Sequence, residues 1–352
     1  MAKQEQRFGD SVDIPLPDDF HIHLRQGLPL TNYTRDAAFS FGRVLVMPNT
    51  SPPIRTPVEA VKYRDRIVAA GRDAEGFEPL MTFYIDTAMR EQEISSLAEA
   101  GVVAGKLYPR GATTNSGHGV SDIEAAFPVF EAMEKADLVL CIHGELPDHF
   151  VLDRESAFLP VLRKIAERFP RLRIVLEHVS TAEGIAAVRD LPDTVAGTIT
   201  VHHLLFTLDE VVGELLRPHR FCKPIAKRPE DRTALREAAF SADPRFFFGS
   251  DSAPHPVTAK ECDGGCAGIY SAPTAVPILL SLFEQHSDLD SFVGFTARNG
   301  ARFYGVPEAS VRVRYTRTGW HVPERTSDIV ALGAGERLEW RTAGRYTQSG
   351  GR

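Results

Sequence analysis

The feature that most constrains this chain is an eightfold alternation of short apolar runs with amphipathic segments. The apolar runs, rich in β-branched and aromatic residues, occupy residues 11–23, 42–50, 78–85, 101–109, 137–145, 173–180, 196–203 and 245–255. Segments with helical spacing lie between most of them, at residues 56–71, 90–101, 122–136, 158–170, 181–191 and 231–240. Apolar strands that alternate with amphipathic helices predict a parallel sheet covered by helices. Eight such units predict a closed (β/α)₈ TIM barrel.

A doubly wound open sheet is the competing architecture for such a pattern. It is disfavoured because no glycine-rich phosphate loop follows the first apolar run. A length of 352 residues suits one barrel of about 250 residues plus extensions. We therefore expect a barrel domain over residues 1–310. Residues 311–352 should form a small C-terminal extension that packs on the barrel, with a flexible end.

Charge and composition narrow the class of partner. The formal net charge is −7, which argues against nucleic acid or an anionic membrane as the main partner. No apolar run approaches the length of a membrane span, and the polar start "MAKQEQRFGD" lacks the apolar stretch of a signal peptide. Four cysteines in a chain of this length fit a reducing compartment. We expect a cytoplasmic protein that acts on a small molecule.

Reactive side chains gather where the apolar runs end. They are His21, His23, Asn49, Lys106, His143, His178, His202, His203, Asp251 and His255. In a TIM barrel the carboxyl ends of the strands surround the active site. The sequence therefore predicts one site built from many separate segments.

Imidazoles and a carboxylate at these positions suit Zn²⁺ or a similar divalent ion. Taken alone, the pair His21-x-His23 is more often a solvated or structural pair than a metal site, and a lone His143 or His178 is as often structural. Four histidines and Asp251 that close separate strands favour the metal. We interpret His202 and His203 as structural.

Specific stretches carry a resemblance to a known family. They are "DDFHIHLRQG", "VMPNT", "GKLYPRGATTNSGHGV", "IHGE", "EHVS", "FCKPIAKR", "GSDSAPH" and "GCAG", spread from residue 17 to about 300. The pattern resembles the amidohydrolase superfamily and, within it, the dihydroorotases of the short, single-barrel bacterial type. The resemblance covers most of the chain.

The resemblance implies a binuclear zinc centre. Two Zn²⁺ ions would be held by His21, His23, His143, His178, Asp251 and Lys106, with Lys106 carboxylated so that its carbamate bridges the metals. An ordinary ammonium cannot ligate a cation, so without the resemblance Lys106 would be interpreted as part of a salt bridge or as a phosphate contact. The implied reaction is the reversible cyclisation of N-carbamoyl-L-aspartate to L-dihydroorotate in pyrimidine biosynthesis. A metal-bridging hydroxide would attack in the hydrolytic direction, and Asp251 would be the acid and base.

Substrate binding calls for a cationic partner for the ring carboxylate. Arg25 lies two residues beyond His23, and its planar fork can pair with a carboxylate through two hydrogen bonds. The resemblance adds Asn49 and His255, main-chain groups near Lys223 and Ala267, and the loop threonines Thr113 and Thr114. It also implies a homodimer. Two alternatives stay open at this stage: another cyclic-amide hydrolase of the hydantoinase or dihydropyrimidinase kind, and an inactive barrel used as a binding subunit.

Overall fold

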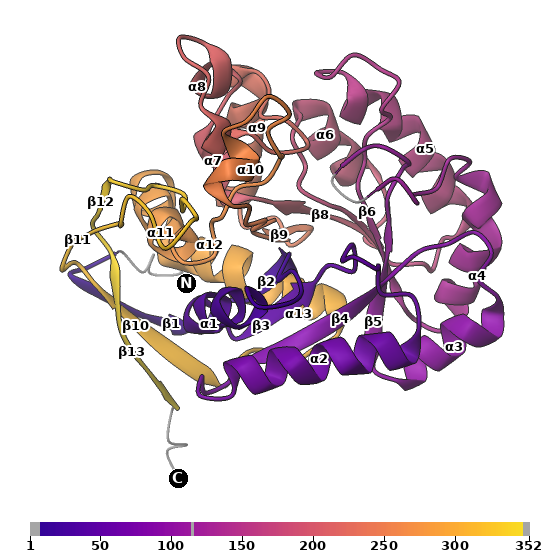
Figure 1. The fold of residues 1–352 in the computed structure, drawn as a ribbon, viewed down its shortest axis with the longest axis horizontal. Helices are drawn as coiled ribbons and strands as arrows, with labels where there is room; N and C mark the ends of the chain where they lie inside the picture. Colours follow the sequence, from indigo (N-terminus) through magenta and orange to yellow (C-terminus); the bar gives the residue numbers. More distant parts are fainter. Residues whose placement is uncertain (1–7, 114–115, 348–352) are drawn as a thin grey trace, which may run out of the picture.

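The eight predicted strands form a parallel barrel (Figure 1). The structure, a computed structural model, describes residues 8–113 and 116–347. Its eight-stranded sheet follows chain order: β2 (Asp19–Ile22), β3 (Arg43–Val46), β4 (Glu78–Tyr84), β5 (Val102–Leu107), β6 (Val139–Ile142), β7 (Ile174–Leu176), β8 (Val195–Ile199) and β9 (Phe246–Phe248). The TIM-barrel prediction is confirmed.

The first and last strands meet just beyond their carboxyl ends. Ile22 and Ser252 form a parallel bridge. The amide of His23 donates to the carbonyl of Ser252 over 3.0 Å, and the amide of Asp251 donates to the carbonyl of His21 over 2.8 Å. The closure therefore lies at residues that the sequence singled out as metal ligands.

Helices cover the outside of the barrel, most of them in the links between successive strands. They are α1 (Leu30–Ser40), α2 (Pro57–Gly71), α3 (Glu91–Glu99), α4 (Phe127–Lys135), α5 (Arg154–Arg168), α6 (Ala182–Asp190), α7 (Val201–Leu205), α8 (Asp209–Val212), α9 (Pro229–Phe240), α10 (Val257–Lys260), α11 (Ala275–His286), α12 (Leu289–Val293) and α13 (Asn299–Tyr304). Two short 3₁₀ helices, η1 (Glu124–Ala126) and η2 (Pro218–Arg220), and one π-helix, η3 (Gly294–Arg298), lie among them. In the part of the chain that the structure describes, none of these helices is long and apolar enough to cross a membrane.

Side chains two residues apart on a strand point to the same face, so the barrel interior is filled by successive layers. One layer is apolar, and the layer nearer the carboxyl ends of the strands is polar. Inside the barrel, Ala104 of β5 and Cys141 of β6 belong to a buried cluster, with Phe20 and Tyr304 stacked at 4.9 Å between ring centroids. Lys106 lies two residues beyond Ala104, so it points to the same interior one layer closer to the carboxyl end. The alternation that builds the core thus also aims the reactive side chains inward.

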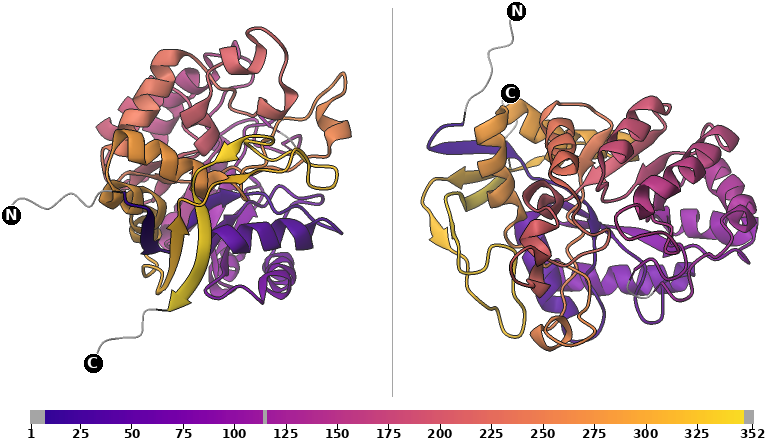
Figure 2. Two further views of the ribbon diagram at one scale, coloured as in Figure 1. Left: turned by 90° about the vertical axis from the view of Figure 1, so that its left-hand side faces the viewer. Right: turned by 90° about the horizontal axis from the view of Figure 1, so that it is seen from above.

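The chain ends build a separate small sheet at the side of the barrel. In it, β1 (Ser11–Pro15) pairs antiparallel with β10 (Val311–Thr316), which pairs with β13 (Arg341–Thr347), as Figure 2 shows. The strands β11 (Trp320–His321) and β12 (Arg337–Leu338) form a second pair. The run 11–23, taken as one strand in the sequence, is therefore two strands with different partners. The predicted flexible end, residues 348–352, lies outside the described residues.

Candidate active site

His21, His23 and Asp251 meet where the barrel closes. The Nε2 atoms of His23 and His21 lie 3.0 and 3.4 Å from Oδ1 of Asp251. Burial lowers the pKa of His23 to about 4, so its imidazole is neutral at neutral pH. Burial alone would raise the pKa of Asp251, but the hydrogen bond from His23 and the charges of the neighbouring histidines lower it overall. Two imidazoles and a carboxylate are suitable ligands for a divalent ion.

Lys106 is a buried lysine in the interior of the barrel. It is fully buried, and its Nζ has no hydrogen-bond partner among the residues that the structure describes. Nζ lies 5.3 Å from the ring centroid of Tyr108. Burial lowers the pKa of Lys106, which favours the neutral amine. An unpaired buried amine is costly as it stands, and it is the nucleophilic form that adds CO₂.

His143 and His178 bring two more imidazoles to the same place. Their ring centroids are 4.7 Å apart, and those of His178 and His21 are 5.2 Å apart. Burial lowers the pKa of both His143 and His178. Within the described residues, Nδ1 of His178 has no hydrogen-bond partner. All six predicted ligands thus lie at the carboxyl end of the barrel.

The backbone is strained at three of these site positions. Arg25, His178 and Asp251 have φ values of 60°, 42° and 44°, which non-glycine residues rarely adopt. Such conformations cost on the order of 1–3 kcal/mol each and are retained where the surrounding structure holds them.

Two carboxylates that the sequence analysis did not assign support the predicted ligands. Oε2 of Glu177 lies 2.8 Å from Nδ1 of His21 and accepts from Oγ1 of Thr198 over 2.7 Å. Oε2 of Glu145 lies 2.7 Å from Nε2 of His143. A carboxylate on one ring nitrogen fixes the tautomer and leaves the other nitrogen for a metal. His21 would therefore ligate through Nε2 and His143 through Nδ1.

Arg25 and His255 form a pair beside the predicted ligands. Nη2 of Arg25 donates to Nε2 of His255 over 2.9 Å, and Nε donates to the carbonyl of Pro254 over 3.2 Å. Burial and the charge of Arg25 lower the pKa of His255 to about 3. A hydrogen bond with the main chain of Ala267 fits a neutral ring whose Nδ1–H donates. The structure thus joins three of the predicted substrate-binding residues.

The other predicted binding residues lie on further segments of the chain. Asn49 is buried beyond the end of β3. Lys223 lies in the loop after η2. The amide of Thr113 donates to Oγ of Ser116 over 2.9 Å, a contact within its own loop. Thr114 lies outside the described residues.

His202, His203 and Cys222 form another buried group, with ligating atoms within 4.8 Å of one another. His203 uses both ring nitrogens, since Nδ1 lies 2.9 Å from Oγ1 of Thr200 and Nε2 lies 3.0 Å from the carbonyl of Pro224. A metal would have to displace one of these hydrogen bonds. These contacts give His203 a structural explanation, whereas within the described residues both ring nitrogens of His202 lack a hydrogen-bond partner.

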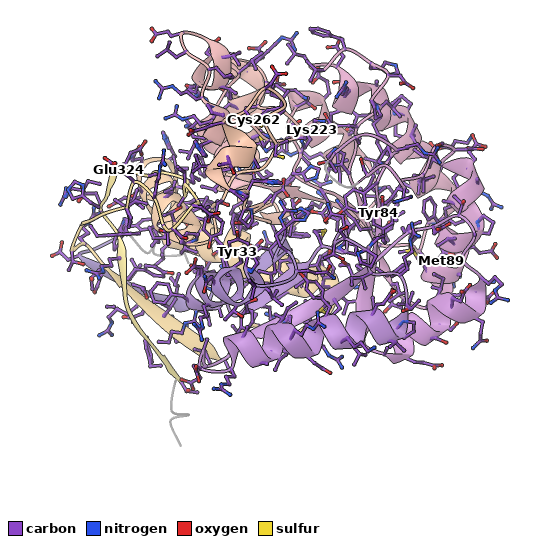
Figure 3. All side chains as sticks on the ribbon, in the orientation of Figure 1. Tyr33, Tyr84, Met89, Lys223, Cys262 and Glu324 are labelled. Atoms are coloured by element: carbon purple, nitrogen blue, oxygen red, sulfur yellow. The ribbon has the colours of Figure 1, made fainter. Side chains whose placement is uncertain are left out.

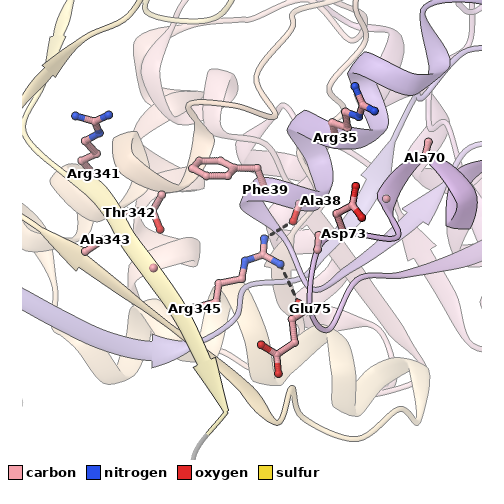
Figure 4. Close-up of a pocket in the computed structure, with 13 residues that line it drawn as sticks. Arg35, Ala38, Phe39, Ala70, Asp73, Glu75, Arg341, Thr342, Ala343 and Arg345 are labelled. Carbon is pink, nitrogen blue, oxygen red and sulfur yellow. Dashed lines mark hydrogen bonds between the residues drawn. The ribbon is translucent and has the colours of Figure 1, made fainter.

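A hollow of about 660 Å³ lies elsewhere, against β13 and the ends of α1 and α2 (Figure 4). Its Arg345 donates to the main-chain carbonyls of Ala38 and Glu75. The carboxyl ends of α1 and α2 lie toward the amino ends of the barrel strands, so this hollow is at the opposite end from the predicted ligands. It is not a part of the candidate active site.

Comparison with known proteins agrees with this geometry. A family model for amidohydrolases matches residues 27–263. A dihydroorotase from a Picosynechococcus species is 45% identical over 342 residues, which cover 95% of this chain and 99% of the relative. The chain belongs to the dihydroorotase family. Among solved structures, the dihydroorotase from Campylobacter jejuni has a TM-score of 0.88 at 37% identity and covers 98% of this chain and 99% of its own.

Another member of the family was solved with a ligand. The dihydroorotase from Saccharomyces cerevisiae, in complex with 5-fluoroorotic acid, has a TM-score of 0.89 at 35% identity, covering 94% of this chain and 98% of that one. An L-hydantoinase from Arthrobacter aurescens also superposes, with a TM-score of 0.80 but only 15% identity over 96% of this chain and 84% of its own. The hydantoinase likeness shows the barrel fold alone.

Proposed function

We propose that this chain is a metal-dependent dihydroorotase that interconverts N-carbamoyl-L-aspartate and L-dihydroorotate. The observation that carries the proposal is the Arg25–His255 pair beside the His23–Asp251 contact, because a fixed cation then lies next to groups that could hold a metal ion. A guanidinium held in this way suits a ring that bears a carboxylate. The 5-fluoroorotic acid bound by the yeast relative is a ring of that kind.

The residues present fit two divalent ions, which we take to be Zn²⁺. His21, His23 and Asp251 would hold one ion, His143 and His178 the other, and Lys106, carboxylated on Nζ, would bridge them. Among the residues that the structure describes, neither Nζ of Lys106 nor Nδ1 of His178 has a hydrogen-bond partner, which supports this assignment. When bound, the ions would supply an activated water near neutral pH and polarise the reacting carbonyl.

The side chains of this chain have distinct parts in the reaction. Arg25 binds the ring carboxylate, and the neutral His255 orients Arg25 through Nε2. Asn49 and the main-chain amides of Lys223 and Ala267 bond the ring, and Thr113 and Thr114 cover it. Neither of these two amides donates a hydrogen bond within the described residues, so both are available to a ring oxygen.

Asp251 moves the proton. In the hydrolytic direction its carboxylate takes a proton from the attacking water and gives it to the ring nitrogen as the amide bond breaks. In the cyclising direction it takes a proton from the ureido nitrogen, and water leaves from the carboxyl carbon. The lowered pKa of Asp251 keeps its side chain deprotonated, the form that can accept the first proton in the hydrolytic direction.

A neutral-ring hydrolase of the hydantoinase kind is the alternative on the same scaffold. The Arg25–His255 pair argues against it, because a neutral ring has no carboxylate to pair with the guanidinium. An inactive barrel is the second alternative, and the presence of all six predicted ligands argues against that. The homodimer stays a prediction, which sedimentation equilibrium tests, and the cytoplasmic location also stays a prediction.

The proposal is tested with zinc-loaded protein and N-carbamoyl-L-aspartate at mildly acidic pH, with dihydroorotate measured by chromatography. We expect dihydroorotate to form, and to be hydrolysed in the reverse assay at higher pH. Hydantoin serves as the parallel substrate. Turnover of hydantoin without any dihydroorotate formation would support the alternative and refute the proposal.

A further inference from the structure

Lys260 is a buried lysine that joins two loops. It ends the short helix α10 and is 3% exposed. Its Nζ donates to the carbonyl of Phe221 over 3.0 Å and to the carbonyl of Gly268 over 2.7 Å. Both acceptors are main-chain oxygens. Burial lowers the pKa of Lys260 to about 8, so the group still carries its charge at neutral pH.

The two loops are those whose main chain is proposed to bond the substrate ring. Phe221 lies two residues before Lys223, and Gly268 directly follows Ala267. The amide of Gly268 also donates to the carbonyl of Phe221 over 2.9 Å. Figure 3 labels Lys223, which lies in the first of these loops, and Cys262, which follows Lys260 by two residues. One carbonyl thus receives donors from Lys260 and from the opposite loop.

The main chain at Gly268 packs closely against His255, the partner of Arg25. Gly268 has a φ of +144°, and a Cβ added there would lie 2.6 Å from the carbonyl oxygen of Ala253 and 2.9 Å from Cδ2 of His255. The main chain of Ala267 is hydrogen-bonded to His255. A shift of the 266–268 loop would therefore move the free Ala267 amide and the neighbour of Arg25 together.

We propose that Lys260 is a positioning residue that holds the 221–223 and 266–268 loops at the spacing required for their amides to bond the substrate ring. The inference rests on the proposed function. An ammonium suits this task because its several N–H donors can bridge two carbonyls, and charge-assisted hydrogen bonds are stronger than neutral ones. Methionine has a similar length and apolar character but no donor, so it removes the bridge with little change in volume.

The test compares Lys260→Met with the unaltered enzyme, using Lys164→Met as the matched control. Lys164 is exposed and pairs with Glu124 on the outside of the barrel. We expect the KM for dihydroorotate to rise about 10-fold in Lys260→Met, with kcat changed less than about threefold. Metal content should stay at two ions per chain. Lys260→Arg, which keeps a cation with several donors, should recover part of the loss, and Lys164→Met should match the unaltered enzyme.

Hydrogen exchange gives a readout that does not depend on activity. The backbone amides of residues 222, 223 and 266–268 should exchange faster in Lys260→Met, while those of the barrel strands should not change. Gly268→Ala reaches the same contact from its other end and should raise the KM as well, so the proposal stays testable if Lys260→Met does not fold.

Several outcomes would overturn the inference. An unchanged KM and unchanged exchange in Lys260→Met would show that the bridge does not position the loops. A loss of kcat in step with a loss of metal would show a general structural role. If the unaltered enzyme did not turn over dihydroorotate, the proposed function would fail, yet the exchange measurement would still report whether Lys260 orders the two loops.

Discussion

The main-chain amide of Asp251 donates to the carbonyl oxygen of His21 over 2.8 Å, so the barrel closes between two predicted metal ligands. The proposed acid and base therefore sits on the same hydrogen-bonded seam as the first ligand pair. Because the seam belongs to the barrel wall, the positions of His21, His23 and Asp251 depend on the fold itself and not on a mobile loop. Sites on such rigid elements hold their ligands at fixed separations.

Removal of the Lys106 side chain should abolish the bridged centre. In Lys106→Ala we expect metal content to fall below two ions per chain and kcat to fall about 10³-fold or more, because ligands of one centre act as a unit. Metal analysis and steady-state kinetics measure both, with the exposed Lys164→Met as control. Full activity in Lys106→Ala would refute the role of a carboxylated lysine.

Glu177 should control metal affinity through His21. Glu177→Gln keeps the shape but weakens the 2.8 Å contact with Nδ1 of His21. Loss of such a carboxylate partner typically costs about 10- to 100-fold in metal affinity or activity. Competition with a chelator measures the affinity. Glu183→Gln is the control, because that glutamate is exposed in the first turn of α6 on the outside of the barrel. Equal affinities in both variants would show that the contact does not support the ligand.

Arg25 should supply the affinity for the ring carboxylate. In Arg25→Met we expect a loss of about 2–4 kcal/mol, which is roughly 30- to 1,000-fold in kcat/KM for dihydroorotate. Metal content should not change, because Arg25 is not a ligand. Arg25→Lys should recover little, since an ammonium lacks the planar fork. A KM that stayed at its original value in Arg25→Met would contradict the assignment.

Because His255 is neutral near neutral pH, its titration should not change the affinity for the substrate in that range. Its pKa is lowered to about 3 from an ordinary value of 6.5 by burial and by Arg25. The unfolded chain therefore binds more protons than the folded chain between about pH 3 and 6.5, so this group's contribution to stability rises with pH over that window and is complete above it. We expect no inflection from His255 in the KM between pH 5 and 8. An inflection near pH 6.5 that disappears in His255→Asn would contradict this.

The sequence was sufficient to predict the barrel because each strand is marked by an apolar run. The reactive side chains at the ends of these runs indicated the site. Sequence reasoning missed helix α1, whose buried side includes the polar Thr34 and Ser40, so that no clean apolar stripe marks it. It also merged β1 with β2, although Pro15 and Pro17 interrupt the run. Proline cannot donate to a ladder, and here the run divides between two sheets.

The supporting contacts were less accessible to sequence reasoning than the ligands. Glu177 precedes His178 in the chain, but its partner His21 lies 156 positions away. Glu145 follows His143 closely, and a carboxylate near a strand-end histidine was the available signal. Lys260 gave no signal, because its acceptors are main-chain carbonyls set by the tertiary structure. Long-range pairs of this kind follow from closure of the barrel.

The most direct measurement compares kcat/KM for dihydroorotate with that for dihydrouracil, the same ring without the carboxylate, on the zinc-loaded enzyme. A site built to pair a charged group rejects a substrate that lacks it by large factors, since its own groups are left unpaired. We predict that dihydroorotate is preferred by about 10³-fold or more, and that Arg25→Met removes most of this preference. Equal or faster hydrolysis of dihydrouracil would contradict the account.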